Sequence, residues 1–151
     1  MKKLLFVLAL AMGTISISNA QELGVRFGNL SAGNVAIDGI FGTGEFSRIH
    51  ADLSFGGGGV GIDALWDFLY RPLGGEAFYW YVGAGPYTFI GNDFKLGLIA
   101  EVGLEYRFNT VPIALGVDWR PYFQLIDNTH FGAEGFGLNV RWVFGGNKTV
   151  E

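Results

Sequence analysis

The chain contains no cysteine and only two histidines among its 151 residues. Disulfide bonds and a lipid anchor on cysteine are therefore excluded, and no spacing of cysteines or histidines indicates a metal site. Charged residues are scarce, at 16% against about a quarter in an average globular protein. Apolar residues make up 50% of the chain, yet no segment after residue 20 has the apolar length of a membrane-spanning helix.

Residues 1–20 have the features of a secretory signal peptide. Lys2 and Lys3 give a basic start, residues 4–11 form a short apolar core, and Ser-Asn-Ala at residues 18–20 supplies small residues at a cleavage site. The apolar core is too short for a spanning helix, so we expect cleavage and export. Loss of the two lysines leaves eight basic against fourteen acidic residues, a net charge of −6 that disfavours nucleic acid as a partner.

The longest regular pattern is an alternation in residues 95–123. Every second residue from Leu96 to Phe108 is apolar or aromatic, and the residues between them are charged or glycine except Ile99. A period of two predicts a β-strand with one apolar and one polar face, whereas a helix would mix the two kinds. The alternation resumes after a turn at 109–112, which predicts a long hairpin. Each arm exceeds the nine to eleven residues or so with which a tilted strand crosses a bilayer.

The same alternation recurs along the chain and predicts eight strands. Because this number is even, the first strand begins and the last strand ends on the same side of the barrel. The expected strands are residues 23–28, 35–42, 47–55, 60–70, 77–90, 95–108, 113–123 and 132–144. A short helix is an alternative for residues 64–70. Pro86 is expected to weaken pairing locally and to mark a bulge.

Two assignments of the strand faces are possible. In a soluble barrel the apolar face points inward, and in a membrane barrel it points outward. The polar face is rich in glycine, which only weakens a strand that faces water but makes room for long side chains inside a narrow barrel. The sequence therefore favours an all-β fold, an eight-stranded antiparallel up-and-down transmembrane β-barrel over residues 21–144. A short polar tail at 145–151 follows.

Aromatic residues gather at one set of strand ends, next to the second, fourth and sixth turns and the C-terminus. This clustering is typical of the aromatic girdle of a membrane barrel. The predicted girdle residues are Phe41, Tyr70, Trp80, Tyr106, Phe108, Trp142 and Phe144. The opposite set of ends carries fewer aromatic residues.

The last expected strand alternates apolar residues and ends in an aromatic residue. Its apolar set is Phe136, Leu138, Val140, Trp142 and Phe144. With the strand count and the signal peptide, this pattern resembles the small outer-membrane barrels of the OmpA and OmpX type, although seven residues follow Phe144 and all loops are short. The resemblance implies outer-membrane lipid as the surroundings, and recognition of strand 136–144 by the barrel assembly machinery.

The polar face carries charges of both signs. In a membrane barrel they would share the lumen, where unpaired charges are costly, so we expect a salt-bridge network that plugs the interior. The predicted lumen residues are Arg26, Asp38, Arg48, His50, Asp52, Asp63, Glu101, Glu105, Arg107, Asp118, Arg120 and Arg141.

Catalysis is disfavoured, and no catalytic, metal-ligating or cofactor-binding residue is predicted. His50, Asp52 and Ser54 lie on one face of one strand, about 6–7 Å apart per step, which is too far for a direct relay. His130 has no serine close to it in the sequence.

Two classes of function remain open. One is a structural or envelope-integrity barrel, or an accessory subunit of a larger outer-membrane complex. The other is a small-solute channel or a lipid-binding barrel. A soluble periplasmic ligand-binding barrel with reversed faces is a weaker alternative.

Overall fold

The computed structural model describes Lys3, residues 22–74 and residues 77–144. The predicted signal peptide, apart from Lys3, and the predicted tail lie outside the described residues. The strands are β1 (Glu22–Gly28), β2 (Val35–Gly42), β3 (Arg48–Gly56), β4 (Gly59–Pro72), β5 (Phe78–Ile90), β6 (Phe94–Arg107), β7 (Ile113–Trp119), β8 (Tyr122–Ile126), β9 (His130–Gly132) and β10 (Phe136–Val143). None of the described residues belongs to a helix that is long and apolar enough to span a bilayer.

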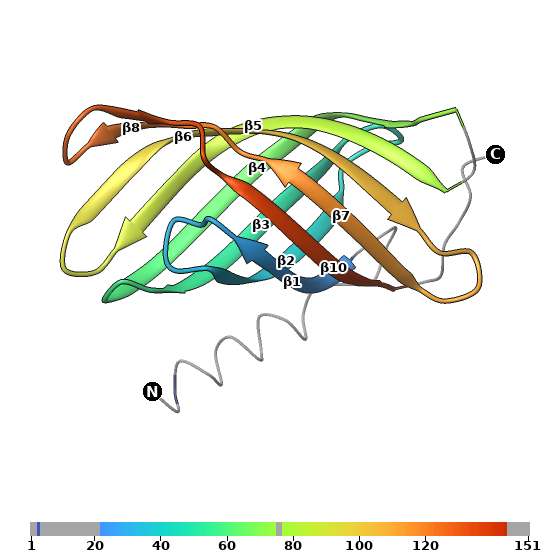
Figure 1. Cartoon of the computed structure of the whole chain (residues 1–151), viewed down its shortest axis with the longest axis horizontal. Helices are drawn as coiled ribbons and strands as arrows, with labels where there is room; N and C mark the ends of the chain where they lie inside the picture. The colour runs from blue at the N-terminus through green and yellow to red at the C-terminus, as the bar shows by residue number, and fades with distance from the viewer. Residues whose placement is uncertain (1–2, 4–21, 75–76, 145–151) are drawn as a thin grey trace.

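The strands form one closed antiparallel barrel (Figure 1). Each strand from β1 to β6 pairs with the next, β6 pairs with β7, β7 with β10, and β10 with β1, which closes the ring. β8 extends the line of β7 along β6, and β9 pairs with β8. The predicted eight-stranded antiparallel barrel is therefore confirmed.

Two of the expected strands are interrupted. The expected strand 113–123 is divided into β7 and β8 at Arg120 and Pro121, because proline has no backbone N–H to donate to the ladder. The expected strand 132–144 is divided into β9 and β10 at residues 133–135. The two breaks face each other, and the Arg120 N–H donates to the Gly135 carbonyl at 2.6 Å.

The only ladder irregularity between β4 and β5 is a bulge at Phe68, where the register shifts between Asp67 and Leu69. Residues 64–70 belong to β4, so the helix alternative is wrong. Pro86 marks no bulge, since the register runs past it unshifted toward both neighbours. Because the bulge adds a residue to β4, Tyr70 lies opposite the buried Tyr81.

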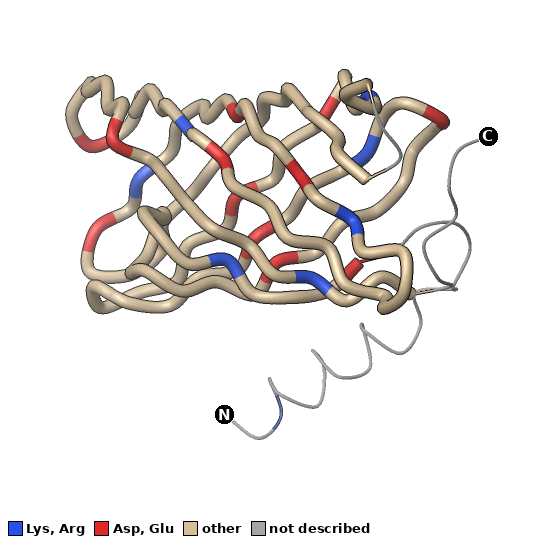
Figure 2. The backbone as a smooth tube through the Cα atoms, turned by 45° about the vertical axis from the view of Figure 1, so that its right-hand side comes forward, with Lys and Arg blue, Asp and Glu red and all other residues tan. Residues whose placement is uncertain are grey.

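The apolar face of the strands points outward. Leu98, Val102 and Val117 are 47–56% exposed, whereas Glu101 and Arg120 are at most 1% exposed. Figure 2 shows that the charged residues are spread along the strands of the wall. Most of the charged strand residues are buried, so their side chains lie inside the barrel. The interior is thus polar and the exterior apolar, the reverse of a soluble barrel.

Glycine makes room for the interior side chains, as the sequence predicts. A Cβ on Gly83 would overlap the Asp67 carboxylate across the strand pair. A Cβ on Gly103 would overlap the ring of Tyr81, its direct cross-strand partner. An eight-stranded barrel has a narrow interior, so each large side chain needs a small residue opposite it.

Candidate functional site: the charged interior and the mouth of the barrel

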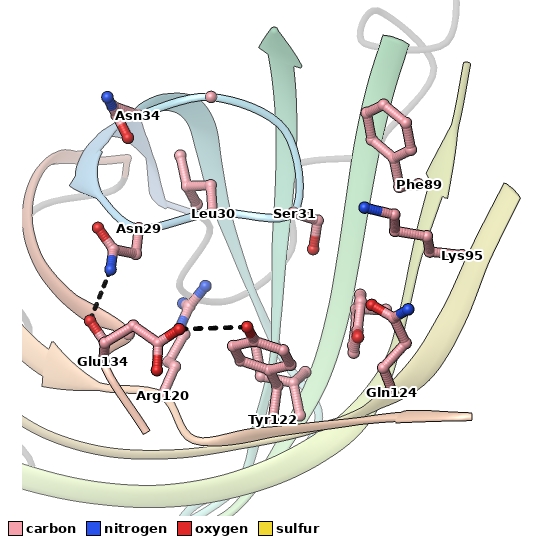
Figure 3. A pocket seen from close by; sticks show the side chains of 14 residues that line it. Asn29, Leu30, Ser31, Asn34, Phe89, Lys95, Arg120, Tyr122, Gln124 and Glu134 are labelled. Carbon is pink, nitrogen blue, oxygen red and sulfur yellow. Dashed lines mark hydrogen bonds between the residues drawn. The ribbon is translucent and has the colours of Figure 1, made fainter. Parts of the chain in front are cut away.

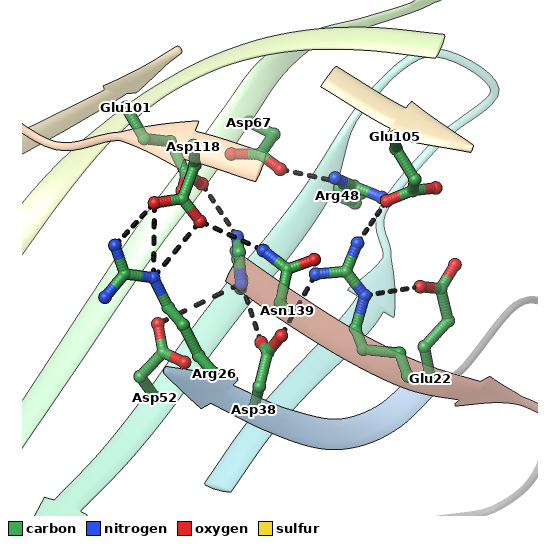
Figure 4. A network of polar contacts seen from close by, with 12 residues as sticks. Glu22, Arg26, Asp38, Arg48, Asp52, Asp67, Glu101, Glu105, Asp118 and Asn139 are labelled. Atoms are coloured by element: carbon green, nitrogen blue, oxygen red, sulfur yellow. Dashed lines mark hydrogen bonds and ion pairs between the residues drawn. The ribbon is translucent and has the colours of Figure 1, made fainter. Parts of the chain in front are cut away.

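The structure brings the predicted lumen residues together in one network, part of which is shown in Figure 4. All of them are buried except Arg107, whose side chain is 14% exposed. The network also contains Glu22, Asp67 and Asn139, which the sequence prediction omitted. Glu22 lies one residue before the expected first strand, and Asp67 continues the alternation of Asp63, so period two could have identified both.

One end of the barrel is the end where β1 begins and β10 ends, here called the terminal end. Near this end, Arg141 on β10 contacts side chains of three other strands. Its Nε donates to Glu22 Oε2 at 2.9 Å, and its Nη1 donates to Asp38 Oδ2 at 3.0 Å. Its Nη2 contacts Glu105. Because these carboxylates lie on β1, β2 and β6, one guanidinium ties opposite walls of the barrel together.

Arg48 and Tyr70 extend this part of the network. Arg48 donates to Asp67 Oδ2 at 2.8 Å and to Glu105 Oε2 at 3.0 Å. Its guanidinium carbon lies 4.2 Å from the ring centroid of Tyr70. The Tyr70 hydroxyl donates to Glu105 Oε1 at 2.9 Å and accepts from Arg107 Nε at 2.8 Å. The β4 bulge thus places a polar aromatic side chain inside the barrel.

His50 and Arg120 occupy the middle of the barrel. The ring nitrogens of His50 lie 2.8 Å from Glu101 Oε1 and 2.7 Å from Asp38 Oδ1. Since ionised carboxylates only accept hydrogen bonds, the imidazolium form satisfies both contacts. Arg120 donates to Glu101 Oε2 at 2.9 Å and also contacts Asp52.

Arg26 and Asp118 form the remaining buried pair. Arg26 Nε donates to the two Asp118 carboxylate oxygens at 3.2 and 3.1 Å, and Nη1 donates to the Asn29 carbonyl at 2.8 Å. Asn139 donates to Asp118 Oδ2 at 3.0 Å. Together the four groups of contacts fill the interior of the barrel over most of its length.

The interior contains more carboxyl groups than basic groups. The eight buried carboxylates are Glu22, Asp38, Asp52, Asp63, Asp67, Glu101, Glu105 and Asp118. The bases facing them are Arg26, Arg48, Arg107, Arg120, Arg141 and His50. One oxygen each of Asp52, Asp63 and Asp67 has no hydrogen-bond partner among the described residues.

His50 belongs to no hydrogen-bonded pair with Ser54 among the described residues, but it belongs to two clusters of possible metal ligands. Ser54 accepts from the Ala32 N–H at 3.1 Å. The two clusters are Asp38, His50 and Asp52, and His50, Asp67 and Glu101. In both clusters His50 contacts carboxylates and each acidic residue contacts arginine or histidine, while one oxygen each of Asp52 and Asp67 has no hydrogen-bond partner among the described residues. A cation would therefore compete with these contacts.

A pocket lies in the mouth at the opposite end, here called the loop end, where the β1–β2 turn faces β8 (Figure 3). Its volume is about 310 Å³. The lining residues are Asn29, Leu30, Ser31, Gly33, Asn34, Tyr87, Phe89, Lys95, Ile99, Arg120, Tyr122, Gln124, Glu134 and Gly135. Arg120 therefore belongs both to the pocket lining and to the interior network. The sequence prediction missed this pocket, because its lining comes from segments far apart in the chain.

The predicted girdle residues lie at the terminal end, with one correction. Trp142 and Phe144 are 51% and 41% exposed. Tyr106 packs edge-on against Phe108, with ring centroids 4.9 Å apart. The prediction for Tyr70 is wrong, because the bulge turns its side chain into the network. Phe41 and Trp80, the remaining predicted members, are partly exposed.

No protein-family model matches the chain, and neither the curated proteins nor the solved structures compared with it contain a match.

Proposed function

We propose that this protein is an integral outer-membrane β-barrel with a plugged interior, which serves envelope integrity or acts as an accessory subunit of a larger outer-membrane complex. The observation that carries the proposal is the separation of the two faces. Apart from Arg71 near the end of β4, the outward positions of the ring strands are apolar or uncharged, and the other charged residues of these strands point inside. A continuous apolar exterior is costly in water and stable in lipid.

The soluble alternative requires the opposite arrangement. A soluble ligand-binding barrel would enclose its apolar side chains and expose its charges. Here Phe136 and Trp66 are 66% and 54% exposed, whereas Glu101 and Asp38 are fully buried. The exposed aromatic residues at the terminal end also fit the interface between lipid and water.

A plugged interior favours a structural role over that of a channel. Arg48, Arg107, Arg120, Arg141 and His50 each contact two or more carboxylates, Arg26 pairs with Asp118, and Tyr81 fills space between them. A solute would have to break several buried ion pairs in order to pass, and breaking one such pair costs about 3–5 kcal/mol. The interior ion pairs therefore hold the strands of the wall in a fixed arrangement.

Fractionation and conductance test the proposal. We expect the protein to remain with the outer membrane after alkaline washing and to require detergent for extraction. Recovery from the periplasmic fraction without detergent would refute membrane insertion. Purified protein in a planar bilayer is expected to give no stable conductance, and a conductance of porin size would refute the plug in favour of a channel.

A further inference from the structure

We propose that the pocket at the loop end binds a neutral saccharide of one or two rings. The pocket is formed by the barrel itself, so the proposal does not depend on membrane insertion. It rests on a cavity with aromatic walls, an unpaired buried hydroxyl, and charged lining groups that are paired or balanced in sign.

Two tyrosines form rigid walls of the pocket. Their rings contact edge to face, with centroids 5.8 Å apart and an interplanar angle of 83°. Tyr87 lies across the backbone of Gly97, and Tyr122 lies across Gly132, each its direct cross-strand partner. A Cβ on either glycine would overlap the ring. Each ring is thus supported from behind by backbone while it lines the cavity.

The Tyr87 hydroxyl has no hydrogen-bond partner among the described residues, although the side chain is only 6% exposed. Leu65 and Ile99 pack around this residue, so its surroundings within the wall are apolar. A buried hydroxyl without a partner is costly. A ligand hydroxyl in the cavity would satisfy it.

The charged groups of the pocket are paired or balance one another in sign. Arg120 donates to Glu101 and Asp52. The Glu134 carboxylate accepts from the Ala133 N–H at 2.9 Å and from the Tyr122 hydroxyl at 3.3 Å. Lys95, the other charged residue of the lining, is opposite in sign to Glu134, so the lining has no excess charge of either sign with which to bind an ionic ligand.

Lys95 lies near the ring of Phe89, with Nζ 5.7 Å from the ring centroid. Uncharged polar groups complete the lining. Gln124 donates to the Asp127 carbonyl at 2.8 Å, and its amide oxygen accepts no hydrogen bond among the described residues. Figure 3 shows Gln124 on the opposite side of the pocket from Asn29 and Glu134, so polar groups face a ligand from both sides.

The size and chemistry of the pocket select the ligand class. A volume of about 310 Å³ lies at the lower limit of small-molecule sites, which span about 300–1,000 Å³. A pyranose has apolar C–H faces that pack on aromatic rings and an equator of hydroxyls that bond to amides and phenols. No charge is required on such a ligand, in keeping with a lining in which Arg120 is paired and Lys95 and Glu134 are opposite in sign.

Titration of the purified full chain with defined sugars tests the proposal. The probes are glucose, galactose, N-acetylglucosamine, lactose and cellobiose, with glucuronate and glucosamine as charged comparisons. The detergent must carry no sugar headgroup, and binding is followed by saturation-transfer NMR and calorimetry. We expect at least one neutral probe to bind with a Kd below about 10 mM.

Three variants locate the site. Tyr87→Phe removes only the hydroxyl and is expected to weaken binding about fivefold, and Gln124→Ala is expected to weaken it by a similar factor. Tyr106→Phe, at the terminal end, is expected to bind as the unaltered protein does. Migration of unheated samples on a denaturing gel verifies that each variant is folded.

The proposal fails if no neutral probe binds at about 10 mM. It also fails if the charged probes bind more tightly than the neutral ones, or if folded Tyr87→Phe and Gln124→Ala proteins bind undiminished. None of these results would affect membrane insertion, which fractionation tests separately.

Discussion

Replacement of Arg141 by methionine is the most direct test of the interior network. Methionine matches the aliphatic stem of arginine and ends where the guanidinium begins, so the main change is the loss of the guanidinium. Three carboxylates lose a partner, namely Glu22, Asp38 and Glu105. The interior also becomes more negative, because carboxylates already outnumber the bases that face them.

The size of the expected loss of stability follows from the partners that the three carboxylates keep. Glu22 keeps Arg107, Asp38 keeps His50, and Glu105 keeps Arg48 and Arg107. No carboxylate is left bare, so the cost is that of breaking one buried ionic unit and not three separate pairs. We expect the free energy of unfolding to fall by about 3–5 kcal/mol.

The assay is denaturant unfolding from phospholipid vesicles, followed by tryptophan fluorescence. Arg71→Met is the matched control, because the exposed Arg71 lies 3.9 Å from the ring centroid of Phe46 and reaches no buried carboxylate. Loss of this exposed cation–π contact is expected to cost about 0.5–1 kcal/mol.

A double variant separates the ionic network from simple packing. If Arg141 and Asp38 are coupled, Arg141→Met with Asp38→Asn loses less stability than the sum of the two single changes, by about 0.5–3 kcal/mol. The reasoning is refuted if Arg141→Met costs no more than Arg71→Met, or if the two network changes are strictly additive. Either result would mean that water, and not Arg141, stabilises the charge of these carboxylates.

Three further changes test the packing, the membrane face and the bulge. Gly85→Ala places a Cβ on the Ala64 carbonyl and is expected to lower the free energy of unfolding from vesicles by about 1–3 kcal/mol. Gly39→Ala is expected to be tolerated, because its Cβ would lie 3.5 Å from the nearest atom. Equal effects of the two changes would contradict the packing. Val102→Arg, near the middle of the outer face, is expected to lower the free energy of unfolding in lipid by about 2–4 kcal/mol. Phe94→Arg, at a strand end, is expected to lower it by only about 0–1 kcal/mol. Equal losses of stability at the two depths would argue against insertion. Tyr70→Phe removes a buried hydroxyl with two partners and is expected to lower the unfolding free energy by about 1–3 kcal/mol; no change would place its side chain outside.

Period-two alternation was sufficient to predict the faces of most strands. Leu98 and Val140 are on the outside and Glu101 is on the inside, as their positions in the alternation require. The reason is geometric, since successive side chains of a strand point to opposite faces whatever the barrel contains. Glycine opposite large interior residues was predictable for the same reason.

The bulge and the strand breaks depend on the partner strands. Phe68 and Leu69 are adjacent apolar residues that disturb the alternation, but only the ladder with β5 shows that the extra residue turns Tyr70 inward. Pro121 has no backbone N–H to donate, and the matching break at 133–135 lies beside it, between neighbouring strands. Such irregularities depend on what the neighbouring strand can pair with.

The sequence by itself determined the strands, their two faces and the collection of charges on one of them, because these follow from local geometry. The tertiary structure alone decided which charges meet. Arg141 and Glu22 are far apart in the chain and lie 2.9 Å apart only because β10 closes the ring against β1. The pocket at the loop end likewise exists only after closure, since its walls come from five separate segments. Register and closure are collective properties of all the strands, which no single stretch of sequence encodes.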